Sequence, residues 1–168
     1  MDGTVQQSLN NQIKHEFDSA YFYLSAAGYF ESVNLSGFAH WMRLQAQEEV
    51  SHAMKIFDFI HDRGASATLQ AIDQPPGGFA SPLDAFTQAL EHERRVTGLI
   101  HDLYGLALEK QDYPAQVLLQ WFISEQVEEE KNATQIVEEL KMASESRSAL
   151  LLLNTQMGAR TAEPETGG

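Results

Sequence analysis

The placement of proline constrains the fold of this chain more than any other feature of its sequence. The first 74 of its 168 residues contain no proline, and apolar residues recur there at the spacing of an α-helix. This pattern predicts one helix over about residues 5–33 and a second that ends near Arg63, before Gly64. A turn at 34–36 joins them, with Ser36 as the expected helix cap. Two long helices joined by so short a turn lie antiparallel.

A second pair of helices is predicted after a long connection. Residues 65–81 are mostly small or polar, and helical spacing resumes at Ser81 and Pro82, a cap followed by proline at the first helical position. This third helix ends at a turn over 111–114, and a fourth runs to about Ser144. A helix of about 28 residues is about 42 Å long, and the extended connection spans about that distance. The connection can therefore run the length of a bundle and join two parallel helices.

A short fifth helix and a polar tail complete the predicted organisation. Four adjacent leucines at 150–153 cover all sides of a helix over about 149–157, which predicts either a buried terminal helix or a contact between subunits. The expected fold is all-α: a four-helix bundle of two antiparallel hairpins, with a long crossover between its second and third helices, plus a short C-terminal helix. We expect one domain over residues 1–158 and a polar, disordered tail over 159–168.

Composition excludes several classes of protein. Asp and Glu number 24 against 11 Lys and Arg, a formal charge of −13, which argues against nucleic acid or an anionic membrane as a partner and favours cations. The absence of cysteine excludes disulfides, thiolate catalysis, iron–sulfur clusters and zinc ribbons. Because the sequence shows neither a secretory signal nor an apolar stretch of about 20 residues, we expect a cytoplasmic protein without membrane spans.

Acidic residues interrupt the apolar stripe of every long helix near its midpoint. The acids concerned, in chain order, are Glu16, Glu48, Glu49, Glu93, Glu125 and Glu129, and His52 interrupts the stripe of the second helix with them. A single glutamate on such a stripe more often sits at its edge and reaches water. Acids at matching height on four helices cannot all be explained in this way, because they would meet inside the bundle. Burying unpaired charges is strongly unfavourable, so these acids need compensating cations. A bound metal is the simplest compensation.

The types of ligand narrow the choice of metal. Glu49 and His52 lie one helical turn apart on one face, and four carboxylates with one imidazole suit a pair of iron or manganese ions that keep open positions. A closed structural zinc site more often uses cysteine or more histidines. Di-iron bundle proteins carry a Glu-x-x-His motif on each of two helices. This chain has one such motif, and residues 126–129 at the corresponding place on the fourth helix read QVEE.

Along essentially its whole length the sequence resembles a known family, the bacterial non-haem ferritins. The matching segments are QEEVSH at 47–52, QDYP at 111–114 and LQWFISEQVEEEK at 119–131. The resemblance implies a ferroxidase centre whose first iron is held by Glu16, Glu49 and His52. Glu49 would bridge to a second iron, completed by two further acids with an amide close by: Glu93, Glu129 and Gln126.

The resemblance also implies a third iron position and a tyrosine beside the centre. The third iron falls on three acids and shares a fourth with the centre: Glu48, Glu125, Glu128 and Glu129. Tyr23 matches the tyrosine of the family and lies about 20° from Glu16 around the first helix. Its hydroxyl either satisfies a carboxylate of the centre, as the hydroxyl of a core aromatic does, or has a functional role, as a hydrogen bond that tunes that carboxylate or as an electron donor during oxygen reduction.

The function implied by the resemblance is iron storage. Fe(II) would be oxidised by O2 or peroxide and deposited as mineral inside a homo-oligomeric cage of twenty-four subunits. No haem is expected, since Val50 stands where the haem-binding methionine of bacterioferritins falls. Two alternatives remain: a di-iron peroxidase or oxygenase that forms no cage, and a metal-free helical signalling bundle whose inward acids find water or side-chain partners.

Overall fold

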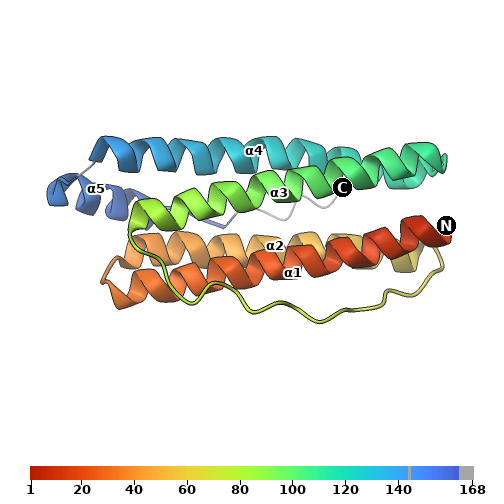
Figure 1. Ribbon diagram of the computed structural model, residues 1–168, viewed down its shortest axis with the longest axis horizontal. Helices are drawn as coiled ribbons and strands as arrows, with labels where there is room; N and C mark the ends of the chain where they lie inside the picture. Colours follow the sequence, from red (N-terminus) through yellow and green to blue (C-terminus); the bar gives the residue numbers. More distant parts are fainter. Residues whose placement is uncertain (144, 163–168) are drawn as a thin grey trace.

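The computed structural model describes residues 1–143 and 145–162, and all the regular structure in them is helical. The five helices are α1 (Gly3–Ser32), α2 (Ser36–Asp62), α3 (Pro82–Glu109), α4 (Tyr113–Ala143) and α5 (Arg147–Met157). Figure 1 shows α1 beside α2 and α3 beside α4, two antiparallel hairpins that pack side by side, with α5 at one end. The predicted all-α four-helix bundle with a short C-terminal helix is confirmed. No helix within the described ranges is long and apolar enough to cross a membrane.

The ends of the helices follow local signals in most places. The chain leaves α2 through Gly64 at a φ of +70°, a conformation that suits glycine. At the start of α3, Ser81 accepts a hydrogen bond from the Asp84 amide (3.0 Å), and Pro82 is the first helical residue. Both boundaries match those predicted from the sequence.

The cap of α2 is an exception, and the prediction of Ser36 in this role was wrong. Ser36 is the first helical residue, and Leu35 before it offers no side-chain cap. Asn154 of α5 supplies the cap instead: its Oδ1 accepts from the amides of Gly37 (2.9 Å) and Phe38 (3.2 Å). The approach is so close that a Cβ on Gly37 would lie 1.7 Å from the Asn154 carbonyl oxygen. Glycine at 37 is therefore required for α5 to dock.

The connection over 65–81 runs along α1 for most of its length, as Figure 1 shows. Its backbone is tied to successive turns of that helix: the Thr68 amide donates to Asn10 (3.0 Å) and the Asp73 amide to Asp18 (2.9 Å). These bonds give an extended segment partners for its polar backbone groups. They confirm that the connection carries the chain from one end of the bundle to the other.

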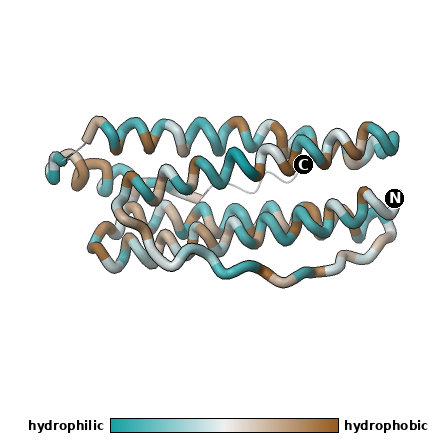
Figure 2. The backbone as a smooth tube through the Cα atoms, in the orientation of Figure 1, coloured by the Kyte–Doolittle hydropathy of each residue, from teal (hydrophilic) through white to brown (hydrophobic). Residues whose placement is uncertain are grey.

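The apolar core is divided into two clusters. One fills the end of the bundle near α5 and includes Phe30, Phe38 and Phe86; the other fills the opposite end and includes Leu9 and Ile100. Figure 2 shows apolar and polar positions alternating along each long helix, as expected of helices with one buried face. The two clusters fix the helices relative to one another on both sides of a polar layer at mid-height.

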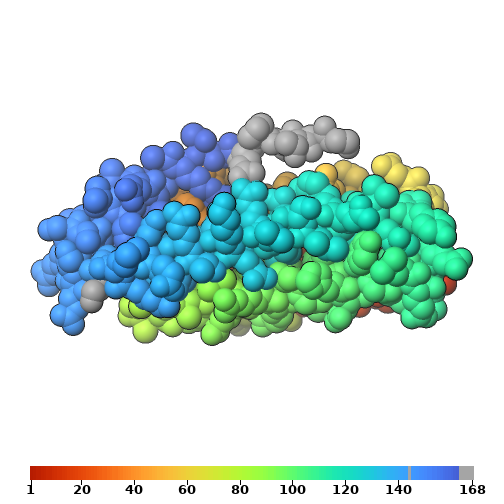
Figure 3. Space-filling view, turned by 90° about the horizontal axis from the view of Figure 1, so that it is seen from above, coloured from red at the N-terminus to blue at the C-terminus, as the bar shows by residue number. Residues whose placement is uncertain are grey.

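The leucines of α5 divide between the two roles that the sequence left open. Leu150 and Leu153 pack against the apolar cluster near α5, whereas Leu151 and Leu152 are 57% and 61% exposed. Figure 3 shows the blue C-terminal region along one end of the bundle. Half of the leucine run therefore holds α5 to its own chain, and half is left facing outward, where a second subunit could cover it.

We predict that Asn154→Ala lowers the free energy of unfolding by about 1 kcal/mol, the usual cost of losing a helix cap. Two amides at the start of α2 lose their acceptor, so the thermal midpoint measured by circular dichroism should fall by a few degrees. Thr155→Ala, which removes an exposed hydroxyl from the neighbouring position, is the matched control. Equal midpoints for the two variants would contradict the assignment of the cap.

Candidate metal centre

Five ligand-type side chains meet in the polar layer between the two apolar clusters. All are 5% exposed or less: Glu16, Glu49, His52, Glu93 and Glu129. They come from all four long helices, because the buried stripe of each helix carries an acid near its midpoint, between the two apolar clusters. The sequence predicted this gathering, and the structure places all five in the interior; we call them the centre. Their role as metal ligands stays a prediction.

Three members of the centre form a group with the spacing of a cation site. Glu16, Glu49 and His52 each offer one atom, and these atoms lie within 4.8 Å of one another. The Nδ1 atom of His52 is 3.5 Å from Glu49 Oε2 and 3.9 Å from Glu16 Oε2. Two carboxylates and one imidazole at this spacing match the hard-to-borderline ligand set of iron.

The remaining acids of the centre are held by neutral donors. Gln126 Nε2 donates to Glu93 Oε2 (3.2 Å), so the predicted amide does lie beside the centre. The Tyr23 hydroxyl also donates to Glu93. The predicted tyrosine therefore lies beside the centre, and its carboxylate partner is Glu93 of α3, which the angle around α1 alone could not show.

Two further glutamines, which the sequence analysis missed, orient the other carboxylates. Gln12 Nε2 donates to Glu16 Oε1 (2.8 Å), and Gln45 Nε2 donates to both oxygens of Glu129 (2.8 Å each) and, at 3.4 Å, to Glu49. Each glutamine precedes an acid of the centre by four residues on its own helix, and this spacing was the available signal. Outer partners of this kind fix the orientation of metal ligands.

Burial makes the ionised form of the centre unfavourable. It raises the pKa of Glu49 and of Glu129 well above the usual value, and neighbouring carboxylates raise both further. Burial likewise raises the pKa of Glu93 to about 7, although the bonds from Tyr23 and Gln126 oppose the rise. Burial and the charge of Glu93 raise the pKa of the Tyr23 hydroxyl, which stays protonated.

The centre lacks the cationic side chains that usually offset buried acids. Within the described part of the chain, His52 is the only basic residue within 4.0 Å of its four glutamates. Lys55, six residues after Glu49 on α2, lies over the Trp121 ring, 4.5 Å from the centroid. Divalent cations would compensate these charges, so the residues present fit bound iron.

A second group of ligand atoms lies beside the centre and shares His52 with it. Atoms of Glu48, His52 and Glu125 fall within 4.8 Å of one another, and we call this group the outer cluster. Two of the acids expected at a third iron position, Glu48 and Glu125, therefore lie close together. Glu128 is exposed and is not part of this group, where the imidazole takes the third place.

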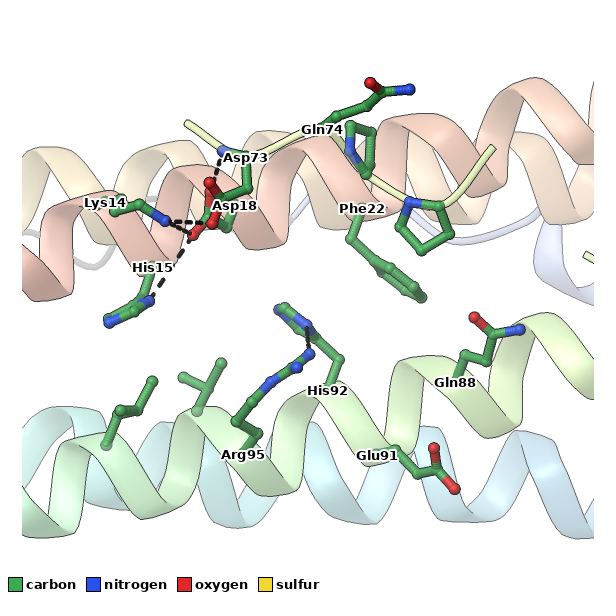
Figure 4. A pocket seen from close by; sticks show the side chains of 14 residues that line it. Lys14, His15, Asp18, Phe22, Asp73, Gln74, Gln88, Glu91, His92 and Arg95 are labelled. Carbon is green, nitrogen blue, oxygen red and sulfur yellow. Dashed lines mark hydrogen bonds and ion pairs between the residues drawn. The ribbon is translucent and has the colours of Figure 1, made fainter. Parts of the chain in front are cut away.

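A pocket of about 630 Å³ lies on another face, between α1, α3 and the 65–81 connection (Figure 4). Its charges compensate one another: Lys14 pairs with Asp18 (2.6 Å) and Asp73 (2.8 Å). Burial lowers the pKa of His92 to about 4, and its neutral ring accepts a bond from Arg95 (2.8 Å). The acids Asp18 and Asp73 of the pocket thus have a cationic partner in Lys14, unlike the acids of the centre among the described residues.

A four-helix bundle whose helix midpoints converge on buried carboxylates and a Glu-x-x-His motif defines the class of carboxylate-rich di-metal bundle proteins. Comparison with known sequences narrows this class. Residues 6–143 match the Ferritin family, described as a ferritin-like domain. The chain therefore belongs to the ferritin family.

Named relatives and solved structures agree with this placement. The chain is 40% identical over 156 residues to the bacterial non-heme ferritin of Bacteroides fragilis, covering 93% of this chain and 97% of the relative. For the bacterial non-heme ferritin of Staphylococcus aureus the identity is 36% over 159 residues, covering 95% and 96%. The open pore ferritin of Archaeoglobus fulgidus has a similar structure, with a TM-score of 0.95 and 45% identity over 96% of this chain and 99% of that one.

We predict that Glu93→Gln stabilises the metal-free protein above pH 7, by on the order of 2 kcal/mol. A carboxyl whose folded pKa is raised from 4.5 to about 7 binds more protons in the folded than in the unfolded state between these values. The stability it contributes is present below about pH 4.5 and is lost as the pH rises through 7. The gain from the variant should therefore vanish toward pH 4.5.

Thermal unfolding across this pH range, in the presence of a chelator, measures the effect. Glu91→Gln, an exposed acid on the same helix, is the matched control and should leave the pH profile unchanged. A Glu93→Gln profile that runs parallel to that of the wild type would show that burial does not penalise this carboxylate.

Proposed function

We propose that this protein is an iron-storage ferritin with ferroxidase activity, which binds two Fe(II) at the centre and stores the Fe(III) product in a cage. The observation that carries the proposal is the set of buried carboxylates and one imidazole at mid-height, with no cationic side chain among the described residues to offset the acids. Relatives named ferritin over more than nine-tenths of the chain favour storage over a di-iron enzyme without a cage or a metal-free bundle.

In this proposal the residues of the centre bind Fe(II) as substrate. Glu16, Glu49 and His52 hold one ion, and Glu49 bridges to a second ion held by Glu93 and Glu129. Each carboxylate that is protonated in the metal-free protein releases its proton on binding. Two Fe(II) then give up two electrons, and O2 takes these with two protons to form hydrogen peroxide. Where peroxide is the oxidant, two electrons and two protons convert it to two waters.

The donors around the centre have a positioning role. Gln12, Gln45 and Gln126 keep amide hydrogens directed at the carboxylates, so the ligands are held in place before iron arrives. Tyr23 holds Glu93 through its hydroxyl. An electron from the phenol during oxygen reduction is the second role that we propose to test at this residue.

Storage requires an assembly, which we propose to be a homo-oligomeric cage of twenty-four subunits in the cytoplasm. The outward-facing Leu151 and Leu152 supply an apolar contact of the kind that subunits cover. A formal charge of −13 per chain favours the uptake of cations and the nucleation of mineral. We take residues 1–158 as the domain that assembles; positions 163–168 of the expected polar tail lie outside the described residues.

Aerobic loading with Fe(II), followed by size-exclusion chromatography with light scattering, tests the proposal. We predict that many iron atoms per chain elute with protein at about 450 kDa, the mass of twenty-four chains of 18.8 kDa. A small oligomer that retains about two irons per chain would indicate a di-iron enzyme instead. Protein that retains no iron at any mass would refute the metal centre.

In the same experiment, Glu49→Ala should slow the initial oxidation of Fe(II) by at least about tenfold, because both proposed ions lose a shared ligand. The assembled mass should stay the same. Asp58→Ala, which removes an exposed acid from the same helix, should oxidise iron at the wild-type rate. Unchanged oxidation in Glu49→Ala would refute the assignment of the centre.

A separate variant tests the third iron position. We predict that Glu128→Ala leaves the first addition of two Fe(II) per chain intact but changes the rate at which later additions are oxidised, because iron leaves the centre past this acid. Stopped-flow absorbance over successive additions measures both phases. Glu138→Ala, an exposed acid further along α4, is the control, and a time course identical to it would remove Glu128 from the path.

A further inference from the structure

The segment that follows α5 brings one arginine onto α2. Arg160 donates through Nη1 to Gln45 Oε1 (2.8 Å) and through Nη2 to Glu48 Oε2 (2.7 Å). Its guanidinium lies 4.6 Å from the centroid of the Trp41 ring, and its carbonyl accepts from His40 Nε2 (2.9 Å). We call this set of four partners the arginine seat.

The arginine seat contacts both groups of ligand-type side chains. Glu48 belongs to the outer cluster. Gln45 uses its oxygen to accept from Arg160, which leaves its NH2 directed at Glu129 and Glu49 of the centre. One guanidinium thus contacts an acid of the outer cluster directly, and reaches the centre through a single amide.

We propose, on the basis of the proposed metal-binding function, that Arg160 is an internal cation that competes with metal for the outer cluster. In the metal-free protein it neutralises Glu48; when a divalent ion binds Glu48 and Glu125, the guanidinium leaves. The reason is electrostatic. The ion pair neutralises the Glu48 carboxylate that would bind the metal, and the positive guanidinium repels a metal ion that approaches within a few ångströms. With side chains 19% and 15% exposed, this repulsion is only partly screened by solvent.

Because Arg160 competes with metal for Glu48, the two sites should bind metal in a fixed order. The centre, whose glutamates have no such partner among the described residues, takes metal first, and the outer cluster binds only at higher concentration. When Arg160 leaves, Gln45 loses the donor that fixes its amide. The hydrogen bond from Gln45 to Glu129 then weakens, so metal bound at the outer cluster changes the hydrogen bonding of a carboxylate in the centre. Because the coupling is reciprocal, a seated Arg160 disfavours outer metal by the same factor that outer metal disfavours the seat.

Titration of the chelator-treated, assembled protein with Zn(II), which has no redox chemistry, tests the proposal. Isothermal titration calorimetry counts the sites and their affinities. The chain has two tryptophans, so in a Trp121→Phe background the emission of Trp41 reports whether the guanidinium stacks on it. We expect a tighter site at the centre, and a weaker site whose filling changes the Trp41 emission.

In this background Arg160→Gln should tighten the weaker Zn(II) site at least about tenfold, because the ion no longer has to displace a guanidinium from its charge-assisted hydrogen bond with Glu48. The tighter site should be unchanged, and Trp41 should already emit as in the filled state. Arg160→Lys keeps the charge but cannot bridge two acceptors as a planar fork does, so it should give an intermediate affinity. Glu48→Gln should lose the weaker site.

Arg43→Gln is the matched control, because it removes an arginine from an exposed ion pair on α2, the helix that Arg160 contacts. The affinities of both Zn(II) sites should equal those of the Trp121→Phe protein. A weaker site that is unchanged or loosened in Arg160→Gln would overturn the competition. Equal tightening by Arg160→Lys and Arg160→Gln would also overturn it, since packing of the segment rather than charge would then be responsible. Absence of the tighter site from every variant would instead refute the metal centre itself.

Discussion

The desolvation of four glutamates at the middle of the bundle is the constraint on which the rest of this structure depends. A buried carboxylate is tolerated only where hydrogen-bond donors, protons or cations replace its water. The chain supplies neutral donors, from three glutamines and one tyrosine, and leaves the positive charge to come from outside. The apolar clusters on both sides hold the helices in register, so the carboxylates cannot separate and hydrate. The stability of the two ends thus maintains an unfavourable arrangement in the middle.

Helix α2 links the chemistry to the C-terminal part of the chain. It carries Glu49 and His52 of the centre, Glu48 of the outer cluster and Gln45 between them, while its first turn is capped by Asn154 of α5. Residues more than one hundred positions apart in sequence therefore determine where this helix begins and which charges lie along it. The ligand-type side chains of α2 are thus supported by contacts from Asn154 and Arg160.

Much of the fold and the composition of the centre could be predicted from the sequence because both depend on periodicity. Apolar spacing placed the four long helices, proline and glycine marked their ends, and acids on apolar stripes identified Glu16, Glu49, Glu93 and Glu129 as inward-facing. Contacts between helices could not be obtained in this way. The cap from Asn154 and the seat of Arg160 each need a partner more than one hundred residues away.

Position around a single helix was also insufficient where a long side chain chooses among neighbours. Tyr23 shares a face with Glu16, yet its hydroxyl reaches Glu93 on another helix. Glu128 belongs to the run of acids on α4 but is exposed, and the group beside the centre contains an imidazole from α2. The resemblance implied a role for each of these residues, but the angle around one helix did not show which neighbours each side chain contacts.

The contact between Gly37 and the backbone of Asn154 has a consequence for assembly. Since no side chain separates the two helices there, the tilt of α5 is set by direct contact of main chains and cannot be adjusted by a rotamer. The outward direction of Leu151 and Leu152 follows from that tilt. In a closed shell, a small change in the angle between neighbours alters the curvature and hence the number of subunits that complete it. In the cage that we propose, the hydrogen atom that Gly37 carries in place of a methyl group would therefore contribute to the number of subunits.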